Sequence, residues 1–164
     1  EGSIPRFLEE AIKGGVPESH YAKAEPAGPL ATFDGAASWV DHPYHDGVAL
    51  IGAAGGAPDP TWGQGLSLTL RDVRVLRDAL LGDDNWDVAG HSYAEEHDRY
   101  YKIIHDVELW ETQLLMETGE EADARRTRAF AAWKEDRTKQ LDVLLSGPVS
   151  DVDERTKMRF FGDE

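Results

Sequence analysis

The chain has 164 residues and a mass of 18.2 kDa, which is the size of one ordinary domain. Its 32 acidic residues outnumber its 17 lysines and arginines, so the formal net charge is −15. This charge argues against binding nucleic acid or an anionic membrane surface, because both require clustered cations. The sequence has no cysteine, which excludes disulfides, thiolate nucleophiles and cysteine-based zinc sites. No apolar run approaches the roughly 20 residues that span a bilayer, and we expect a cytoplasmic protein.

The first part of the chain is predicted to contain a helix, a loop and a short strand. Apolar residues recur at helical spacing over 4–15, where Pro5 suits a first turn and Gly14 a stop. Residues 16–27 are polar and interrupted by prolines, which is typical of a loop. The segment 29–33 is predicted to be an edge strand.

The middle of the chain predicts a strand, a loop and a helix. Gly47–Gly52 is a continuous apolar run bounded by glycines, which indicates a strand buried on both faces. The segment 52–65 contains five glycines and two prolines and is predicted to be a loop. A helix is expected over 66–81, and its apolar residues lie on one face: Leu66, Leu70, Val73, Leu76 and Leu80.

The rest of the sequence is predicted to be helical. Periodic apolar residues predict one helix over 86–116 and a second over 120–145, which ends before Gly147 and Pro148. A short helix is expected over 151–161. The predicted fold class is therefore α/β with a mainly helical C-terminal tail.

The strand, glycine-rich loop and helix form the arrangement with the most chemical content. A helix N-terminus presents backbone N–H groups and about half a unit of positive charge. Glycines at 52, 55, 56, 63 and 65 would let a flat or anionic ligand approach the backbone closely. The alternative interpretation is an ordinary strand-to-helix connection that happens to be rich in glycine.

The segment 52–68 resembles the second flavin-binding motif of FAD-dependent monooxygenases of the aromatic-hydroxylase type. That motif reads G-D-A-A, then a proline, then G-x-G-L-N before a long helix, and the spacing from Gly52 to Pro60 to Gly65 matches it without a gap. The resemblance covers the chain as the family's C-terminal part. It implies that 1–46 is a remnant of the substrate-binding domain, 47–82 the FAD-binding strand–loop–helix and 83–164 the C-terminal helical region, an incomplete FAD-binding fold.

The resemblance also implies the roles of individual residues. The loop would contact the ribityl chain of FAD, and the start of the helix would face the pyrimidine edge of the flavin, where a helix N-terminus stabilises negative charge. Trp62 lies at the presumed flavin face. Two roles are open for this residue: it lines a substrate pocket, or it packs as an ordinary core side chain. The cofactor contacts implied are Gly52, Ala53, Pro60, Gly63, Gln64, Gly65 and Leu66.

The sequence departs from the family pattern in three ways. Ala53 replaces the aspartate that binds a ribityl hydroxyl, a loss of about 1.5–3 kcal/mol or roughly one to two orders of magnitude in affinity. Ser67 replaces the usual asparagine. No G-x-G-x-x-G fingerprint occurs in the 164 residues. We therefore expect a C-terminal fragment or split half that is inactive without its N-terminal dinucleotide-binding part.

The function implied is NAD(P)H- and O2-dependent hydroxylation or epoxidation of a small organic substrate, with the N-terminal half of the same enzyme as partner. The alternative is a non-redox helper or interaction module, derived from such an enzyme, that no longer binds FAD. We assign no catalytic acid or base. No metal site is predicted from His42 and His45, or from His91 and His97, because their spacing fits no common ligand motif.

Overall fold

The computed structural model describes residues 3–31 and 35–164, which fall into two compact units, 1–35 and 36–164. The first unit contains helix α1 (Ile4–Lys13) and a 3₁₀ turn, η1 (Glu18–His20). The hydroxyl of Ser3 caps α1 by accepting from the Arg6 amide, so the predicted first helix is confirmed. Of the predicted strand over 29–33, residues 29–31 are not in a strand, and 32–33 lie outside the described residues.

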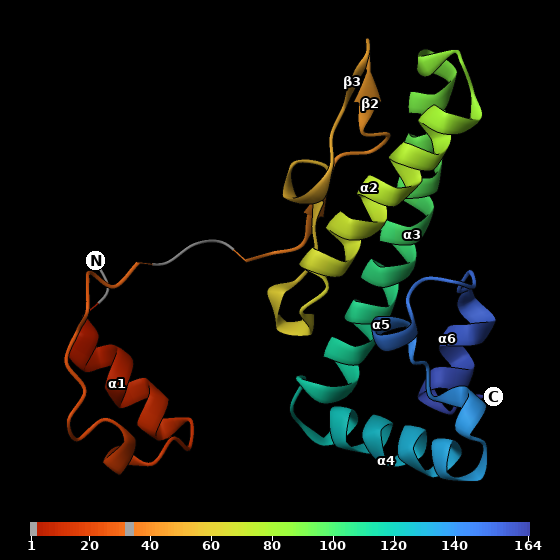
Figure 1. Ribbon diagram of the computed structural model, residues 1–164. Coiled ribbons are helices and arrows are strands. Elements are labelled where there is room, and N and C mark those ends of the chain that lie inside the picture. The colour runs from red at the N-terminus through yellow and green to blue at the C-terminus, as the bar shows by residue number, and fades with distance from the viewer. Residues whose placement is uncertain (1–2, 32–34) are drawn as a thin grey trace. The chain divides into compact units, whose positions relative to one another are not determined.

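The second unit begins with two small antiparallel sheets (Figure 1). Strand β1 (Ser38–Trp39) pairs with β4 (Gly56–Ala57), and β2 (Tyr44–His45) pairs with β3 (Val48–Ala49). The β2–β3 turn has positive φ at both Asp46 and Gly47, which favours a tight hairpin. The prediction of a strand buried on both faces was therefore wrong: the apolar run supplies one strand of an isolated hairpin, and Val48 is 60% exposed.

Helices α2 (Gly65–Gly82) and α3 (Trp86–Leu115) lie side by side, as Figure 1 shows. Their positions agree with the predicted helices over 66–81 and 86–116. Asn85 caps α3 by accepting from the amides of Asp87 and Val88. The two 3₁₀ turns of the glycine-rich loop, η2 (Gly52–Ala54) and η3 (Pro60–Trp62), precede α2.

The C-terminal part contains α4 (Glu120–Glu135), η4 (Arg137–Lys139), α5 (Val143–Ser146) and α6 (Glu154–Phe161). The single helix predicted over 120–145 was wrong, because α4 ends where Asp136 turns to an extended backbone conformation. The Asp136 carboxylate accepts from the backbone amide and hydroxyl of Thr138, and these bonds start η4 instead of another turn of α4.

Helix α3 is the centre of the hydrophobic core. Its buried side chains pack with residues from α2, α4, α5 and α6. This arrangement gives an α/β protein that is mostly helical. The largest core side chains from α3 are Tyr100, Tyr101, Ile104, Trp110 and Leu114. Among the described residues, no helix is both long and apolar enough to cross a membrane.

Candidate functional site

The glycine-rich loop is held to the helices by hydrogen bonds from buried side chains. The amide of Gly52, which has a positive φ of 60°, donates to Asp72 of α2 over 2.7 Å. Asp72 also accepts from the Tyr100 hydroxyl of α3. Because Asp72 is fully buried between the loop and both helices, it fixes the start of the loop against the core.

Two further tyrosines of α3 bind the same region. The Tyr93 hydroxyl donates to the Leu50 carbonyl over 2.6 Å, and the Tyr101 hydroxyl donates to the Gly56 carbonyl over 2.9 Å. A Cβ atom at Gly56 would stand 2.4 Å from the Tyr101 ring, so only glycine allows this approach. The tyrosine hydroxyls thus donate to backbone carbonyls that the amides of a neighbouring strand would bind in a larger sheet.

The polar cluster around Asp72 is largely shielded from water. Burial raises the pKa of the Asp72 carboxyl, although its two hydrogen-bond donors oppose that change. His97 stacks on Tyr101 and is fully buried, and burial lowers its pKa. Its Nε2 atom is buried with no hydrogen-bond partner among the described residues. The neutral imidazole is therefore favoured.

Glu108 of α3 holds the second half of the loop. Its carboxylate accepts from the Asp59 amide over 3.3 Å, while its Oε1 atom has no partner in the described part of the chain. Burial raises the pKa of Glu108 to about 7. The Asp59 side chain in turn accepts from the Thr61 amide and starts η3.

The loop ends at the N-terminus of α2, which is open. Gly63 adopts a left-handed conformation with φ of 68°, and a Cβ atom at Gly63 or Gly65 would meet no atom within 4 Å. Within the described residues, the amides of Gly65, Leu66 and Ser67 have no protein acceptor, and the first turn of α2 contains no acidic residue. Leu66 is 72% exposed. This end of the helix can therefore donate hydrogen bonds to an anionic or electron-rich group.

The other predicted cofactor contacts lie in different environments. Ala53 is exposed in η2, and Pro60 is exposed at the start of η3. Gln64 is half-buried, and its amide nitrogen donates to the carbonyls of Trp62 and Leu144. Trp62 is half-buried, and its indole nitrogen is buried without a partner among the described residues.

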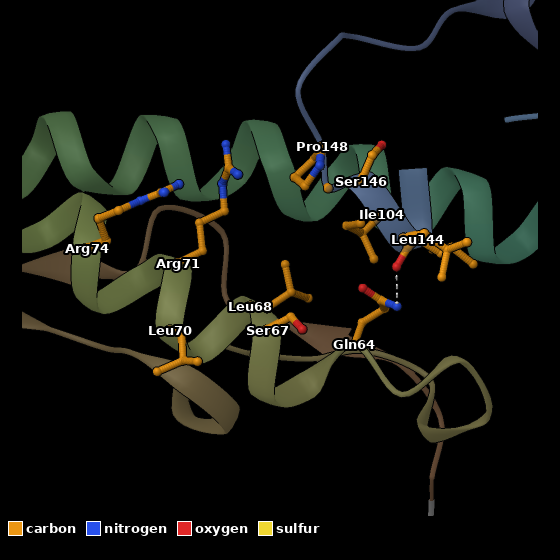
Figure 2. A pocket seen from close by; sticks show the side chains of 12 residues that line it. Gln64, Ser67, Leu68, Leu70, Arg71, Arg74, Ile104, Leu144, Ser146 and Pro148 are labelled. Atoms are coloured by element: carbon orange, nitrogen blue, oxygen red, sulfur yellow. Dashed lines mark hydrogen bonds between the residues drawn. The ribbon is translucent and has the colours of Figure 1, made fainter. Parts of the chain in front are cut away.

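A cavity of about 490 Å³ lies beside this end of α2, between α2, α3 and the segment 144–148 (Figure 2). The Gln64–Leu144 hydrogen bond closes part of its wall. Two arginines of α2, Arg71 and Arg74, line it together with leucine and isoleucine side chains. Sequence reasoning missed this cavity, because its lining combines residues 64–74, Ile104 and residues 144–148, which are far apart in the chain.

Sequence reasoning also missed the tyrosine contacts and the pairing of two histidines. His42 Nε2 and His91 Nδ1 lie 2.7 Å apart, and the rings are stacked. The periodic placement of Tyr93, Tyr100 and Tyr101 on one face of α3 predicts burial but not which loop atoms the hydroxyls reach. Comparisons with protein-family models, curated proteins and solved structures gave no match to the chain.

Proposed function

We propose that the chain is the C-terminal part of a cytoplasmic FAD-dependent monooxygenase that uses NAD(P)H and O2 to hydroxylate or epoxidise a small organic substrate. The observation that carries this proposal is the open N-terminus of α2, where the amides of Gly65, Leu66 and Ser67 have no acceptor among the described residues and a Cβ atom at Gly63 or Gly65 would meet no atom within 4 Å. Bound FAD would supply the activation of O2 and the transfer of one oxygen atom to the substrate.

The residues around this opening fit the polar edge of a flavin. The amides of Gly65, Leu66 and Ser67 can donate to its carbonyl groups. The partial positive charge at the N-terminus of α2 stabilises negative charge on this edge of the flavin. Asp72 holds the start of the loop and Glu108 its middle, which orients these donors in advance of binding. Ala53 provides no acceptor for a ribityl hydroxyl, so that bond must come from another part of the enzyme.

The apolar face of α2 supports the requirement for an N-terminal half. The side chains predicted to form one helical face do so, but that face is largely exposed. Isolated exposed apolar residues are common, whereas a continuous stripe usually marks a surface that another protein part covers. The exposed large apolar residues on α2 are Leu66, Leu70, Val73, Leu80 and Leu81.

A second candidate function is a non-redox helper derived from such an enzyme. The exposed Ala53, which lacks the hydrogen-bonding side chain of the family motif, favours this alternative. The helper would keep the fold of the loop through Asp72 and the tyrosines without binding FAD.

FAD titration of the full chain separates the two functions. We expect saturable quenching of flavin fluorescence, which Gly65→Val should abolish, because its branched side chain would occupy the space that the flavin edge needs. The variant should still fold, since a Cβ at Gly65 meets nothing within 4 Å. Gly82→Ala is the matched control, because Gly82 lies in equally open space at the other end of α2.

Two results would contradict the flavoenzyme proposal. Equal quenching by wild type and Gly65→Val would show that FAD binds elsewhere. No saturable quenching by a folded wild-type chain, at FAD concentrations high enough to detect binding by half a site, would support the helper instead.

A further inference from the structure

The cavity beside α2 has an unusual charge for this protein. Among the described residues, its lining contains two arginines and no aspartate or glutamate, although the chain carries 32 acidic residues and a net charge of −15. The remaining polar lining comes from Gln64, Ser67 and Ser146. The cavity is thus a local positive site in an otherwise acidic molecule.

Arg71 is a largely buried cation whose charge is poorly compensated. Its side chain is 20% exposed and lies over the Tyr100 ring. The nearest carboxylate, Glu96, already accepts two hydrogen bonds from Arg99, at 2.7 and 2.9 Å. Arg71 approaches Glu96 only at 3.6 Å, and its Nε atom is buried with no partner in the described part of the chain. Burying a guanidinium donor without an acceptor is unfavourable, so an anion in the cavity would relieve this cost.

Arg74 adds a second positive charge on the same side of α2, one turn further along the helix. It is exposed and forms no ion pair with another described residue. Figure 2 shows both arginines extending from α2 at the cavity. The two guanidinium groups can therefore act on one ligand.

The opposite part of the lining is apolar. Leu68, Ile104 and Leu144 provide surfaces from three different helices. A volume of about 490 Å³ is in the range of sites that hold small organic molecules. We propose that this cavity binds an organic carboxylate, with the carboxylate on Arg71 and Arg74 and an apolar body against these three side chains. The planar fork of a guanidinium matches a carboxylate with two parallel hydrogen bonds.

The two arginines of this site are separate from the open amides at the start of α2, although Gln64 and Ser67 border both regions. It requires neither FAD nor an N-terminal half, because every residue named lies in unit 36–164. Gln64, which bonds to Leu144, stands at the boundary between the cavity and the glycine-lined opening. Carboxylate binding and FAD binding can therefore succeed or fail independently.

The test uses the full chain and two probes that differ in charge, 1-naphthoate and neutral 1-naphthamide. Calorimetric titration should show binding of 1-naphthoate and at least about tenfold weaker binding of 1-naphthamide. Arg71→Gln and Arg74→Gln should each weaken 1-naphthoate binding by about tenfold. Arg77→Gln should bind like wild type, because Arg77 is exposed, pairs with Asp78 and lies outside the cavity lining.

Several results would overturn the proposal. Equal affinity for the two probes would mean that binding is only hydrophobic, and undetectable binding of 1-naphthoate would mean that the cavity takes no carboxylate. Arg71→Gln could lose stability, since Arg71 stacks on Tyr100, so thermal melting must accompany each titration. Arg74 is exposed, so a folded Arg74→Gln with wild-type affinity refutes the site. Gly65→Val should retain 1-naphthoate binding, which distinguishes this result from failure of the flavin proposal.

Discussion

At the residue scale, Asp72 combines complete burial with two hydrogen bonds, from the Gly52 amide and the Tyr100 hydroxyl. Asp72→Ala would leave the Gly52 amide and the Tyr100 hydroxyl buried without acceptors. We expect the free energy of unfolding to fall by about 3 kcal/mol, whereas Tyr100→Phe, which keeps the carboxylate bound to Gly52, should cost about 1 kcal/mol. Urea unfolding followed by circular dichroism measures both values.

Asp78→Ala is the control for this prediction, because Asp78 lies on the same helix but its side chain is exposed. Its cost should stay within about 0.5 kcal/mol of zero. If Asp72→Ala were equally harmless, the loop would not depend on this carboxylate.

Glu108 makes stability depend on pH. Burial raises the pKa of its carboxyl from 4.5 to about 7, so folding favours the protonated form. This contribution is complete below pH 4.5 and is lost as the pH rises through 7. We expect Glu108→Gln to be more stable than wild type by up to about 3 kcal/mol at pH 8, with the difference shrinking toward pH 5. Unfolding curves at both pH values test this; a difference that stays constant would contradict it.

The sequence predicts the types of these residues but not their partners. An acidic residue follows Arg71 in the helix, yet nothing local indicates that it meets Gly52, 20 positions earlier. Such contacts depend on how α2 and α3 pack.

At the element scale, the most accurate predictions rest on local signals. Helices α1, α2 and α3 were predicted because caps, glycines and apolar periodicity lie within the same short segment. The helix over 120–145 failed at Asp136, where hydrogen bonds to Thr138 compete with helix continuation. The exposed apolar face of α2 shows another limit of sequence-based prediction. Periodicity predicts which residues share one face of a helix, but not whether the rest of this chain buries that face.

Gly90 lies inside α3 although glycine has a low helix propensity. The packing of the β2–β3 hairpin against α3 explains why glycine occurs there. A Cβ atom there would lie 2.2 Å from the Tyr44 ring, which belongs to the β2–β3 hairpin. Gly90→Ala should strengthen α3 locally by about 1 kcal/mol, but displacing the ring should leave a net loss of about 1–3 kcal/mol. Thermal melting checks this prediction against Gly82→Ala, which faces open space and should not lose stability.

If Gly90→Ala proved as stable as wild type, the contact between the hairpin and α3 would be adaptable. Tyr44 should then remain buried in the variant. Its hydroxyl donates to Asp87, so Tyr44→Phe provides a separate measure of that hydrogen bond.

At the scale of the whole molecule, the net charge of −15 is expected to oppose compactness. Most ion pairs in the described residues are at least partly exposed and contribute little. Raising the salt concentration from about 0.01 to 0.15 M, which shortens the screening length from roughly 30 to 8 Å, should therefore raise Tm by roughly 2–4 °C. Scanning calorimetry measures the change, and a lower Tm in salt would show that the ion pairs outweigh the repulsion.

Composition predicts this charge, and the order of elements predicts an α/β chain with a helical tail. The cavity cannot be predicted from the sequence in the same way, because its lining brings Arg71 and Ser67 together with Leu144 and Pro148. Only the packing of α2 and of α5 against α3 places them together.

The way the glycine-rich loop is held has a consequence for solvent exchange of its backbone hydrogens. The Gly52 amide is bonded to a fully buried carboxylate, so its hydrogen should exchange with deuterium slowly. The amide of Gly65, only 13 positions away, and that of Leu66 have no acceptor in the described part of the chain and should exchange quickly. One short segment therefore contains a slowly exchanging amide, at Gly52, and fast ones, at Gly65 and Leu66. A molecule that occupies the opening would slow the exchange of Gly65 and Leu66 and leave that of Gly52 unchanged.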